Sequence, residues 1–174
     1  MASARILVIE ADPFLSKLYR VKLKDLKYEV DVALNGEEAH HLLKLNRYDG
    51  VLMDLVLPYR DGFTLLQDMK RMRKHLKVKA ITSELQQKED LEKAAKLGAD
   101  HYFVKNESQT YEIIENFKAL LEGKRLPHHT GYSMKNGKAT KLKEKTTPKK
   151  PAKKKPAAKK TAPKKKTPKS KKKA

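Results

Sequence analysis

Gly50-Val-Leu-Met-Asp54 is an apolar run typical of a buried strand, and it ends in a carboxylate. The chain continues through Leu55-Val-Leu-Pro58 into the polar segment Tyr59-Arg-Asp61-Gly62. Burying an ionised carboxylate costs free energy unless another group pairs with it or it takes part in chemistry. Packing alone does not require an acid at this position. Asp54 is therefore the strongest candidate functional residue of the chain.

Short apolar strands alternate with amphipathic stretches along residues 4–122. The predicted strands cover residues 5–9, 28–33, 50–54, 78–82 and 101–105. The predicted helices cover residues 12–26, 36–45, 63–73, 88–97 and 111–121. Asp12 and Pro13 open the first helix as its N-cap and first turn. Its expected apolar face is Phe14, Leu15, Leu18, Val21 and Leu26. This alternation predicts an α/β fold with a parallel sheet that helices cover on both faces.

Four polar side chains stand at or just after the carboxyl ends of the predicted strands. They are Glu10, Asp54, Thr82 and Lys105. In open α/β sheets, ligands bind at this end of the strands. Each residue alone has an ordinary explanation, such as a solvated strand end or a surface lysine. Together, two acids, a hydroxyl and an ammonium on one rim predict a functional site.

The positive charge of the chain is concentrated near its end. Of the net charge of +20, residues 135–174 carry +18, from 19 lysines and the single acid Glu144. The first 134 residues hold 22 basic against 20 acidic side chains. We expect a near-neutral globular domain over residues 4–122, a linker over 123–137, and a disordered tail rich in Lys, Pro and Ala over 138–174.

Lysines spaced by prolines can contact phosphates as point charges without reading bases. We therefore expect the tail to bind DNA or RNA without sequence preference. The tail lysines expected to do so are Lys149, Lys150, Lys153, Lys154, Lys155, Lys164, Lys165 and Lys166. The tail composition is similar to the carboxyl-terminal domains of linker histones (histone H1-like) and of histone-like bacterial proteins. No membrane partner is expected, because apolar anchors are missing beyond Leu142.

Several classes of site are excluded by composition. The chain has no cysteine, so disulfides, thiolate metal sites and cysteine nucleophiles are absent. Glu10 and Asp12 interrupt the apolar start of the chain, which is unlike a signal peptide. No run reaches the ~18 to 20 apolar residues needed to span a bilayer. We expect a cytoplasmic protein, with nucleoid association if the tail binds DNA.

Four separated motifs resemble the receiver domain (CheY-like) of bacterial two-component response regulators. They are Ile6-Leu-Val-Ile-Glu10, Val51-Leu-Met-Asp-Leu-Val-Leu-Pro-Tyr-Arg-Asp-Gly-Phe63, Thr82-Ser83 and Gly98-Ala-Asp-His-Tyr-Phe-Val-Lys105. Their order and spacing agree with the family from residue 4 to about residue 122. The resemblance implies a flavodoxin-like (βα)5 fold, with a doubly wound sheet of strand order 2-1-3-4-5.

The resemblance also implies roles for the rim residues. Asp54 would accept a phosphoryl group from a histidine kinase or a phosphotransfer protein. Thr82 and Lys105 would contact the phosphoryl oxygens, and Tyr102 would swing inward when Thr82 moves. The domain would be a phosphoacceptor and not an enzyme, apart from its own phosphotransfer and dephosphorylation.

A Mg²⁺ ion is the cofactor that the resemblance implies. Its implied ligands are Glu10, Asp54 and the backbone carbonyl of Val56. If Pro13 fixes the register, Ala11 stands where the family usually keeps a directly metal-binding aspartate. A methyl group cannot bind the ion, so we expect weakened Mg²⁺ binding. Asp12 is a candidate substitute, although its N-cap role competes.

Asn106 is a second departure, because the family usually has a cis proline after the lysine. A cis bond before a residue other than proline costs roughly 3 to 4 kcal/mol, so we expect a trans Lys105–Asn106 bond.

Two functions fit these observations. One is a stand-alone receiver in a phosphorelay, phosphorylated on Asp54, whose output module is the basic tail. The other is a phosphorylation-deficient pseudo-receiver that acts as a nucleoid-associated or docking protein. A phosphatase with an aspartyl nucleophile is disfavoured, because Val56 stands where its second acid would be. The cognate kinase, the regulated process and homodimer formation are left open.

Overall fold

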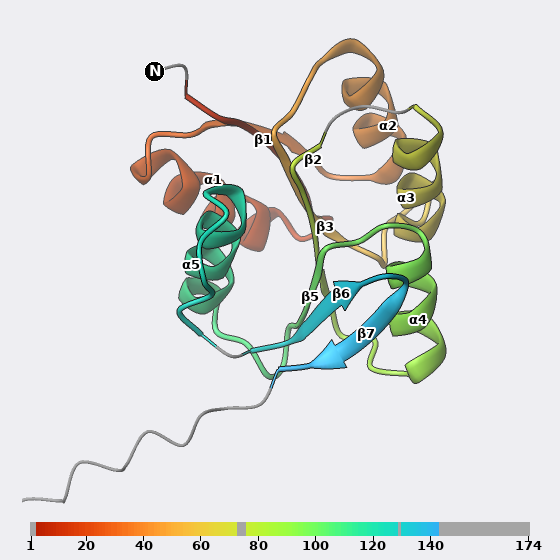
Figure 1. The fold of residues 1–174 in the computed structure, drawn as a ribbon. Helices are drawn as coiled ribbons and strands as arrows, with labels where there is room; N and C mark the ends of the chain where they lie inside the picture. Colours follow the sequence, from red (N-terminus) through yellow and green to blue (C-terminus); the bar gives the residue numbers. More distant parts are fainter. Residues whose placement is uncertain (1–2, 73–75, 129, 143–174) are drawn as a thin grey trace, which may run out of the picture.

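A seven-stranded sheet lies between two layers of helices (Figure 1). The computed structural model describes residues 3–72, 76–128 and 130–142. The strands are β1 Arg5–Ile9, β2 Glu29–Ala33, β3 Gly50–Asp54, β4 Val78–Ser83, β5 His101–Val104, β6 Tyr132–Lys135 and β7 Lys138–Lys141. The helices are α1 Pro13–Asp25, α2 Gly36–Leu45, α3 Gly62–Arg71, α4 Lys88–Lys96 and α5 Thr110–Leu121. Within these ranges, no helix is both long and apolar enough to cross a membrane.

The first five strands are parallel and follow the order β2-β1-β3-β4-β5. This confirms the predicted flavodoxin-like sheet. The strand order reverses beside β1, because β2 pairs with one side of β1 and β3 with the other. The carboxyl ends of β1 and β3 therefore lie next to each other, at the point where such folds bind ligands.

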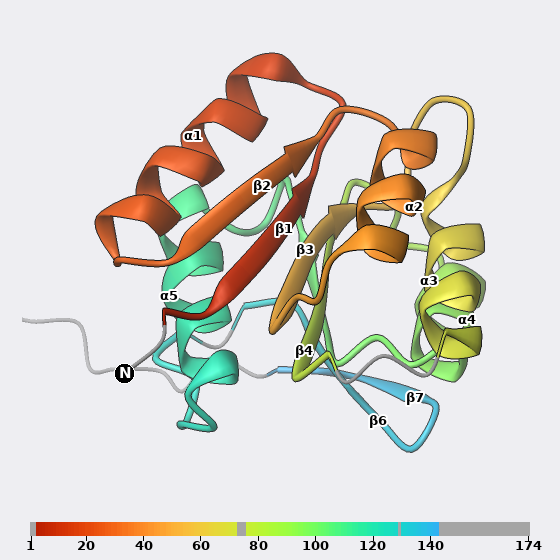
Figure 2. The same cartoon turned by 90° about the horizontal axis from the view of Figure 1, so that it is seen from above.

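The helices form one layer on each face of the sheet. Helices α1 and α5 cover one face, and α2, α3 and α4 cover the other (Figure 2). Successive side chains of a strand point to opposite faces, so each strand contributes to two hydrophobic cores. On β5, for example, Tyr102 packs in the core under α4, whereas Phe103 packs in the core with Phe117 of α5.

Side-chain caps fix where α1, α2 and α3 begin. The Asp12 Oδ1 atom accepts hydrogen bonds from the backbone N–H groups of Phe14 and Leu15, both at 2.8 Å, which confirms the predicted N-cap of α1.

At the start of α2, Gly36 allows a close approach to the loop after β3. A Cβ atom there would lie 1.8 Å from the Arg60 carbonyl oxygen, so a larger residue would push this loop away.

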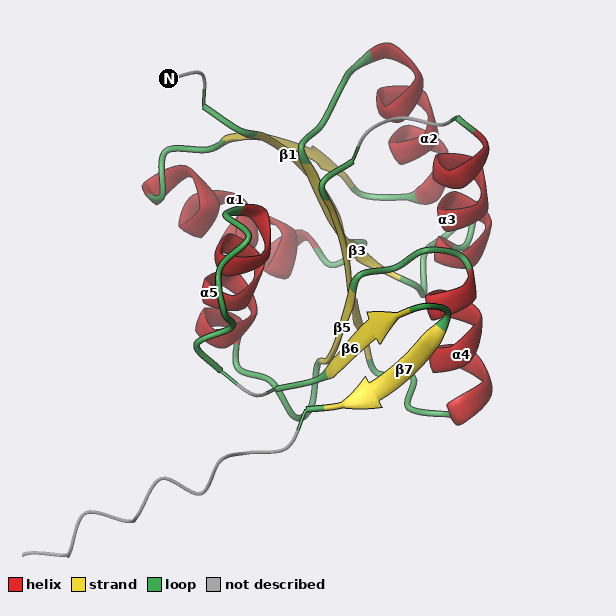
Figure 3. Ribbon diagram, viewed as in Figure 1, coloured by secondary structure: helices red, strands yellow, loops and turns green. Residues whose placement is uncertain are grey.

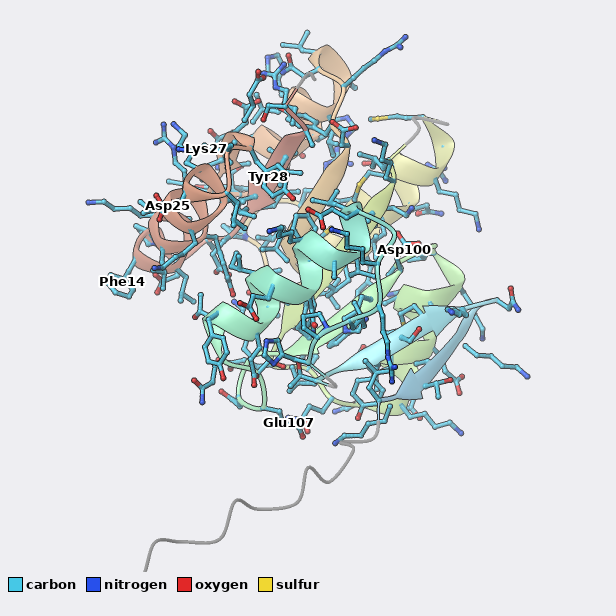
Figure 4. All side chains as sticks on the ribbon, turned by 60° about the vertical axis from the view of Figure 1, so that its left-hand side comes forward. Phe14, Asp25, Lys27, Tyr28, Asp100 and Glu107 are labelled. Atoms are coloured by element: carbon cyan, nitrogen blue, oxygen red, sulfur yellow. The ribbon has the colours of Figure 1, made fainter. Side chains whose placement is uncertain are left out.

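Helix α1 turns a different face to the core than predicted. Its buried residues are Ser16, Tyr19 and Leu23. Phe14 points outward and is 74% exposed, and Val21 is 47% exposed (Figure 4). The predicted apolar face was therefore partly wrong. The buried face of α1 is set by its packing against the sheet and α5, and these neighbours cannot be read from the helix alone.

Strands β6 and β7 form a hairpin that the sequence analysis missed (Figure 3). A linker over 123–137 and disorder from 138 were predicted, but order continues to residue 142. The turn residues Asn136 and Gly137 have φ values of 52° and 70°, as the tight turns of two-residue hairpins require. The prediction failed because the lysine-rich composition outweighed this Asn-Gly signal. Residues 143–174 lie outside the described residues, so their predicted disorder stays a prediction.

The hairpin extends the sheet beyond β5. Strand β6 pairs with β5 in antiparallel fashion, so β5 is an interior strand and β7 forms the edge. Gly131 enters β6 with φ at 79°, and a Cβ atom there would lie 2.1 Å from the Tyr102 carbonyl oxygen. Met134 is buried and joins the core under α4. The backbone before β6 thus packs directly against β5.

Polar contacts from Asn116 hold the segment that leads to the hairpin. Asn116 is fully buried in α5. Its amide donates to the His128 carbonyl at 2.9 Å and accepts from the His128 N–H at 3.0 Å. His101 of β5 is also buried, and its Nε2 atom lies 3.1 Å from the Thr130 carbonyl. These bonds connect the hairpin to α5 and β5.

The buried His101 predicts a loss of stability in acid. Burial lowers its pKa to about 4, although the hydrogen bond with the Thr130 carbonyl opposes the shift. The unfolded chain, with a pKa of about 6.5, binds the proton first as pH falls. The contribution of neutral His101 to the free energy of unfolding is therefore complete above about pH 6.5. It is lost as the pH falls toward 4, and the loss amounts to at most about 3 kcal/mol. Urea unfolding of His101→Phe should lack this dependence, whereas the exposed control His41→Phe should keep it. An unchanged pH slope in His101→Phe would refute this account.

Candidate functional site

The predicted rim residues meet at the carboxyl ends of the central strands. Asp54 is the last residue of β3, and Glu10 follows β1 directly. Thr82 on β4 is the register partner of Asp54. All three are buried, with 3% of Glu10, 8% of Asp54 and 1% of Thr82 exposed. Two buried acids in one place require a compensating charge.

Lys105 supplies that charge. Its Nζ atom lies 2.7 Å from Asp54 Oδ2 and 2.7 Å from Glu10 Oε2. The second oxygens of the two carboxylates are also bonded. Glu10 Oε1 accepts from the Asp12 N–H at 3.2 Å, and Asp54 Oδ1 accepts from the Val56 N–H at 3.0 Å. One ammonium thus serves two carboxylates, which leaves the group with a net charge of −1.

The electrostatics of Lys105 follow from these contacts. Burial alone would lower its pKa, but the hydrogen bonds and charges of Asp54 and Glu10 raise it above the ordinary value. Lys105 therefore stays protonated at neutral pH. No peptide bond among the described residues is cis, so the predicted trans Lys105–Asn106 bond is confirmed. With this trans bond, the lysine still reaches both acids.

Tyr102 lies inward, on the α4 side of the sheet. It is fully buried, and its hydroxyl donates to the Leu85 carbonyl at 2.7 Å. Burial raises the pKa of Tyr102 to about 12. The ring of Tyr132 from β6 meets it edge-on, with centroids 6.5 Å apart. Tyr102 thus already has the inward position to which the predicted swing would bring it.

The donor set fits a Mg²⁺ ion that is bound by few protein ligands. The carboxyl group of Asp12 caps α1, as its competing role predicted, and Ala11 offers only a methyl group. Within the described part of the chain, no cluster of three or more His, Cys, Asp or Glu side chains could hold a metal. Mg²⁺ often uses only one or two carboxylates and keeps several waters. Glu10 and Asp54 meet that need, but Lys105 competes for both.

Tyr19 of α1 is a site neighbour that the sequence analysis did not identify. It is 2% exposed, and burial raises its pKa to about 12. The charges of Lys105, Glu10 and Asp54 also act on its hydroxyl. The sequence signal was weak, because a tyrosine four residues after Leu15 looks like ordinary helix packing. The packing of α1 brings it close to the acids.

The chain belongs to the response regulator receiver family. The model of the "Response regulator receiver domain" matches residues 6–118, which is more than half of the chain. This family comprises the phosphoacceptor domains of two-component systems. Fold, rim residues and family model therefore agree on the class of protein.

Relatives and solved structures support this assignment. The chain is 32% identical over 117 residues to the transcriptional regulatory protein RprY of Bacteroides fragilis, covering 67% of this chain and 49% of RprY. It is 31% identical over 118 residues to the "DNA-binding dual master transcriptional regulator RpaA" of Synechocystis, covering 67% and 48%. The Francisella response regulator 1452 receiver domain superposes with a TM-score of 0.63 at 26% identity, covering 70% of this chain and 98% of that domain. The chain thus spans about half the length of these two curated relatives.

Removing Lys105 should destabilise the fold through the acids that it serves. Lys105→Met would leave Glu10 and Asp54 buried without a counter-charge, at a cost of about 3 kcal/mol at neutral pH. The cost should shrink in acid strong enough to protonate both carboxylates. Urea unfolding at both pH values measures it, with the exposed Lys17→Met as the matched control. Equal stability of the two variants at neutral pH would contradict the arrangement.

Proposed function

We propose that Asp54 accepts a phosphoryl group in a phosphorelay. The observation that carries this proposal is the 2.7 Å contact between Lys105 Nζ and Asp54 Oδ2 on the ligand-binding rim. The donor would be a phosphohistidine of a histidine kinase or a phosphotransfer protein. An Asp54 carboxylate oxygen attacks the phosphorus, the phosphorus–nitrogen bond breaks, and the imidazole leaves. The product is an acyl phosphate on Asp54.

The neighbouring side chains would stabilise the charge that moves onto Asp54. Lys105 is already beside the attacked carboxylate and gains phosphoryl oxygens as further acceptors. Thr82, beside Asp54 on β4, would donate its hydroxyl hydrogen to a phosphoryl oxygen. A bound Mg²⁺, held by Glu10, Asp54 and the Val56 carbonyl, would supply further charge neutralisation. Such transfers depend on positioning and electrostatics more than on covalent machinery.

The signal would travel through β5 to the hairpin. Lys105 follows β5 directly, and Thr82 is the register partner of Phe103 on that strand. Strand β6 pairs with β5 at Tyr102. A phosphoryl group that draws Thr82 and Lys105 toward Asp54 would therefore act on the strand to which the hairpin is bonded. We propose the hairpin, and the chain after residue 142, as the output element.

The tail would bind DNA without sequence preference. Residues 143–174 contain 16 lysines and one acid. The relative RpaA is named as a DNA-binding regulator, which favours DNA over RNA as the partner. Binding through lysines releases counterions, so affinity should fall steeply with salt. The protein would then act in the cytoplasm, close to the nucleoid.

A pseudo-receiver is the second candidate, and Ala11 favours it. With Ala11 in place of an acid and Lys105 bound to both remaining carboxylates, Mg²⁺ binding could be too weak to support phosphorylation. The domain would then serve as a docking module for a DNA-associated protein.

Phosphorylation separates these two functions. We expect the whole chain, incubated with acetyl phosphate and Mg²⁺, to gain the mass of one phosphoryl group, and Asp54→Asn to gain none. Ala11→Asp should accelerate the gain, because it adds a carboxylate beside Glu10 and Asp54. Intact-mass spectrometry over time measures all three. A wild-type chain that stays unmodified while Ala11→Asp is phosphorylated would favour the pseudo-receiver.

A further inference from the structure

Four exposed lysines lie around the end of α4, which the hairpin turn approaches (Figure 1) and to which a lysine near the end of α3 is bonded. We call this group the hairpin corner; its members are Lys70, Lys96, Lys135 and Lys138. Lys135 and Lys138 are direct partners across the hairpin. Lys70 Nζ donates to the Lys96 carbonyl at 3.2 Å. A Cβ atom on Gly137, in the turn, would lie 3.6 Å from Lys96 Cγ.

The corner lysines lack acidic partners. Among the described residues, none of the four lies within 4.0 Å of a carboxylate oxygen. Asp100 and Glu107 are the acids near the two ends of the hairpin (Figure 4), and both are already paired. Asp100 pairs with Lys79 at 3.3 Å, and Glu107 pairs with Lys141 at 3.1 Å. The corner is therefore a patch of uncompensated positive charge.

Fold stability does not account for the whole group. Lys70 and Lys96 lie at the ends of their helices, where the helix dipole favours a cation. Like charges directly opposite in a hairpin are destabilising, which applies to Lys135 and Lys138. Lysines on an edge also discourage pairing with a further strand, but this does not explain why they meet the helix lysines. A bound polyanion would relieve the repulsion among all four.

We propose that the hairpin corner binds the phosphate backbone of duplex DNA, as a folded extension of the tail's binding surface. This inference rests on the tail's proposed DNA binding. Strand β7 spans roughly 10 Å between the corner and the lysine-rich chain after residue 142, which is less than the width of a DNA major groove. A duplex lying along β7 would meet both. The four lysines can contact phosphates as point charges, but they provide no aromatic ring on which a base could stack. The contact therefore does not depend on the DNA sequence.

The corner lies at the opposite end of the sheet from Asp54. Strand β6 runs antiparallel to β5, so the hairpin turn lies beyond the amino end of β5, whereas Lys105 follows its carboxyl end. Contact with the corner alone therefore leaves the phosphoryl-acceptor rim open, whereas a duplex that lies along the whole of β7 also reaches the end of the sheet where Lys105 lies.

The test compares the salt dependence of DNA binding among whole-chain variants. The corner variant carries Lys96→Gln, Lys135→Gln and Lys138→Gln. The control carries Lys17→Gln, Lys22→Gln and Lys24→Gln, the same loss of charge on exposed positions of α1. Fluorescence anisotropy with a random-sequence duplex measures the affinity at several salt concentrations. The quantity compared is the slope of log affinity against log salt concentration. Each lost phosphate contact reduces the slope by about 0.9. We expect a reduction of about 2 to 3 in the corner variant and none in the control.

A second readout on the wild-type chain does not depend on variant folding. DNA should protect Lys135 and Lys138 from chemical acetylation but leave Lys17 and Lys22 reactive. Equal slopes for corner and control variants, with no such protection, would overturn the inference while leaving the tail's DNA binding intact. If even the wild-type chain fails to bind the duplex, the proposed DNA binding of the tail fails, and the corner's role fails with it. Neither result bears on phosphorylation of Asp54.

Discussion

The ammonium group of Lys105 is the interaction on which the rest of the site depends. It holds Glu10 and Asp54 together at 2.7 Å from each, on a rim where water reaches little of either acid. Without it, two like charges would be buried side by side. The contact also ties three strands together, because Glu10 follows β1, Asp54 ends β3 and Lys105 follows β5. An event that changes the charge on Asp54 must therefore be felt at β5.

The hairpin gives β5 a second role, as an interior strand of the sheet. In a five-stranded sheet β5 would be an edge, but here β6 is hydrogen-bonded to it and Asn116 fixes the approach. Strand β7 is therefore the edge strand on this side of the sheet, and the lysine-rich chain continues from it. The proposed phosphoryl acceptor and the hairpin corner thus lie at opposite ends of one sheet, whereas the chain after β7 continues from the acceptor's end. A single strand pair, β5 with β6, connects them.

The rim could be predicted from sequence because it follows from topology. Once the strands are recognised as parallel, Glu10, Asp54, Thr82 and Lys105 must fall at one end of the sheet. The hairpin could not be predicted by composition, since lysine-rich segments usually lack a core, and only Asn136-Gly137 indicated a turn. The site neighbour Tyr19 was missed for another reason. Which side of α1 is buried depends on where α5 and the sheet lie, and that information is not local.

In the proposed magnesium site, Lys105 occupies both carboxylates that would bind the ion. Titration calorimetry of Mg²⁺ into the whole chain and into Lys105→Met tests it directly, because the tail is the same in both. Removing the positive charge of Lys105, a few ångströms from the ion, should strengthen Mg²⁺ binding by more than about 1 kcal/mol at an effective dielectric constant of about 20. We predict that Lys105→Met binds Mg²⁺ at least about ten-fold more tightly. Equal or weaker binding by a folded Lys105→Met chain would show that Lys105 does not compete with the ion.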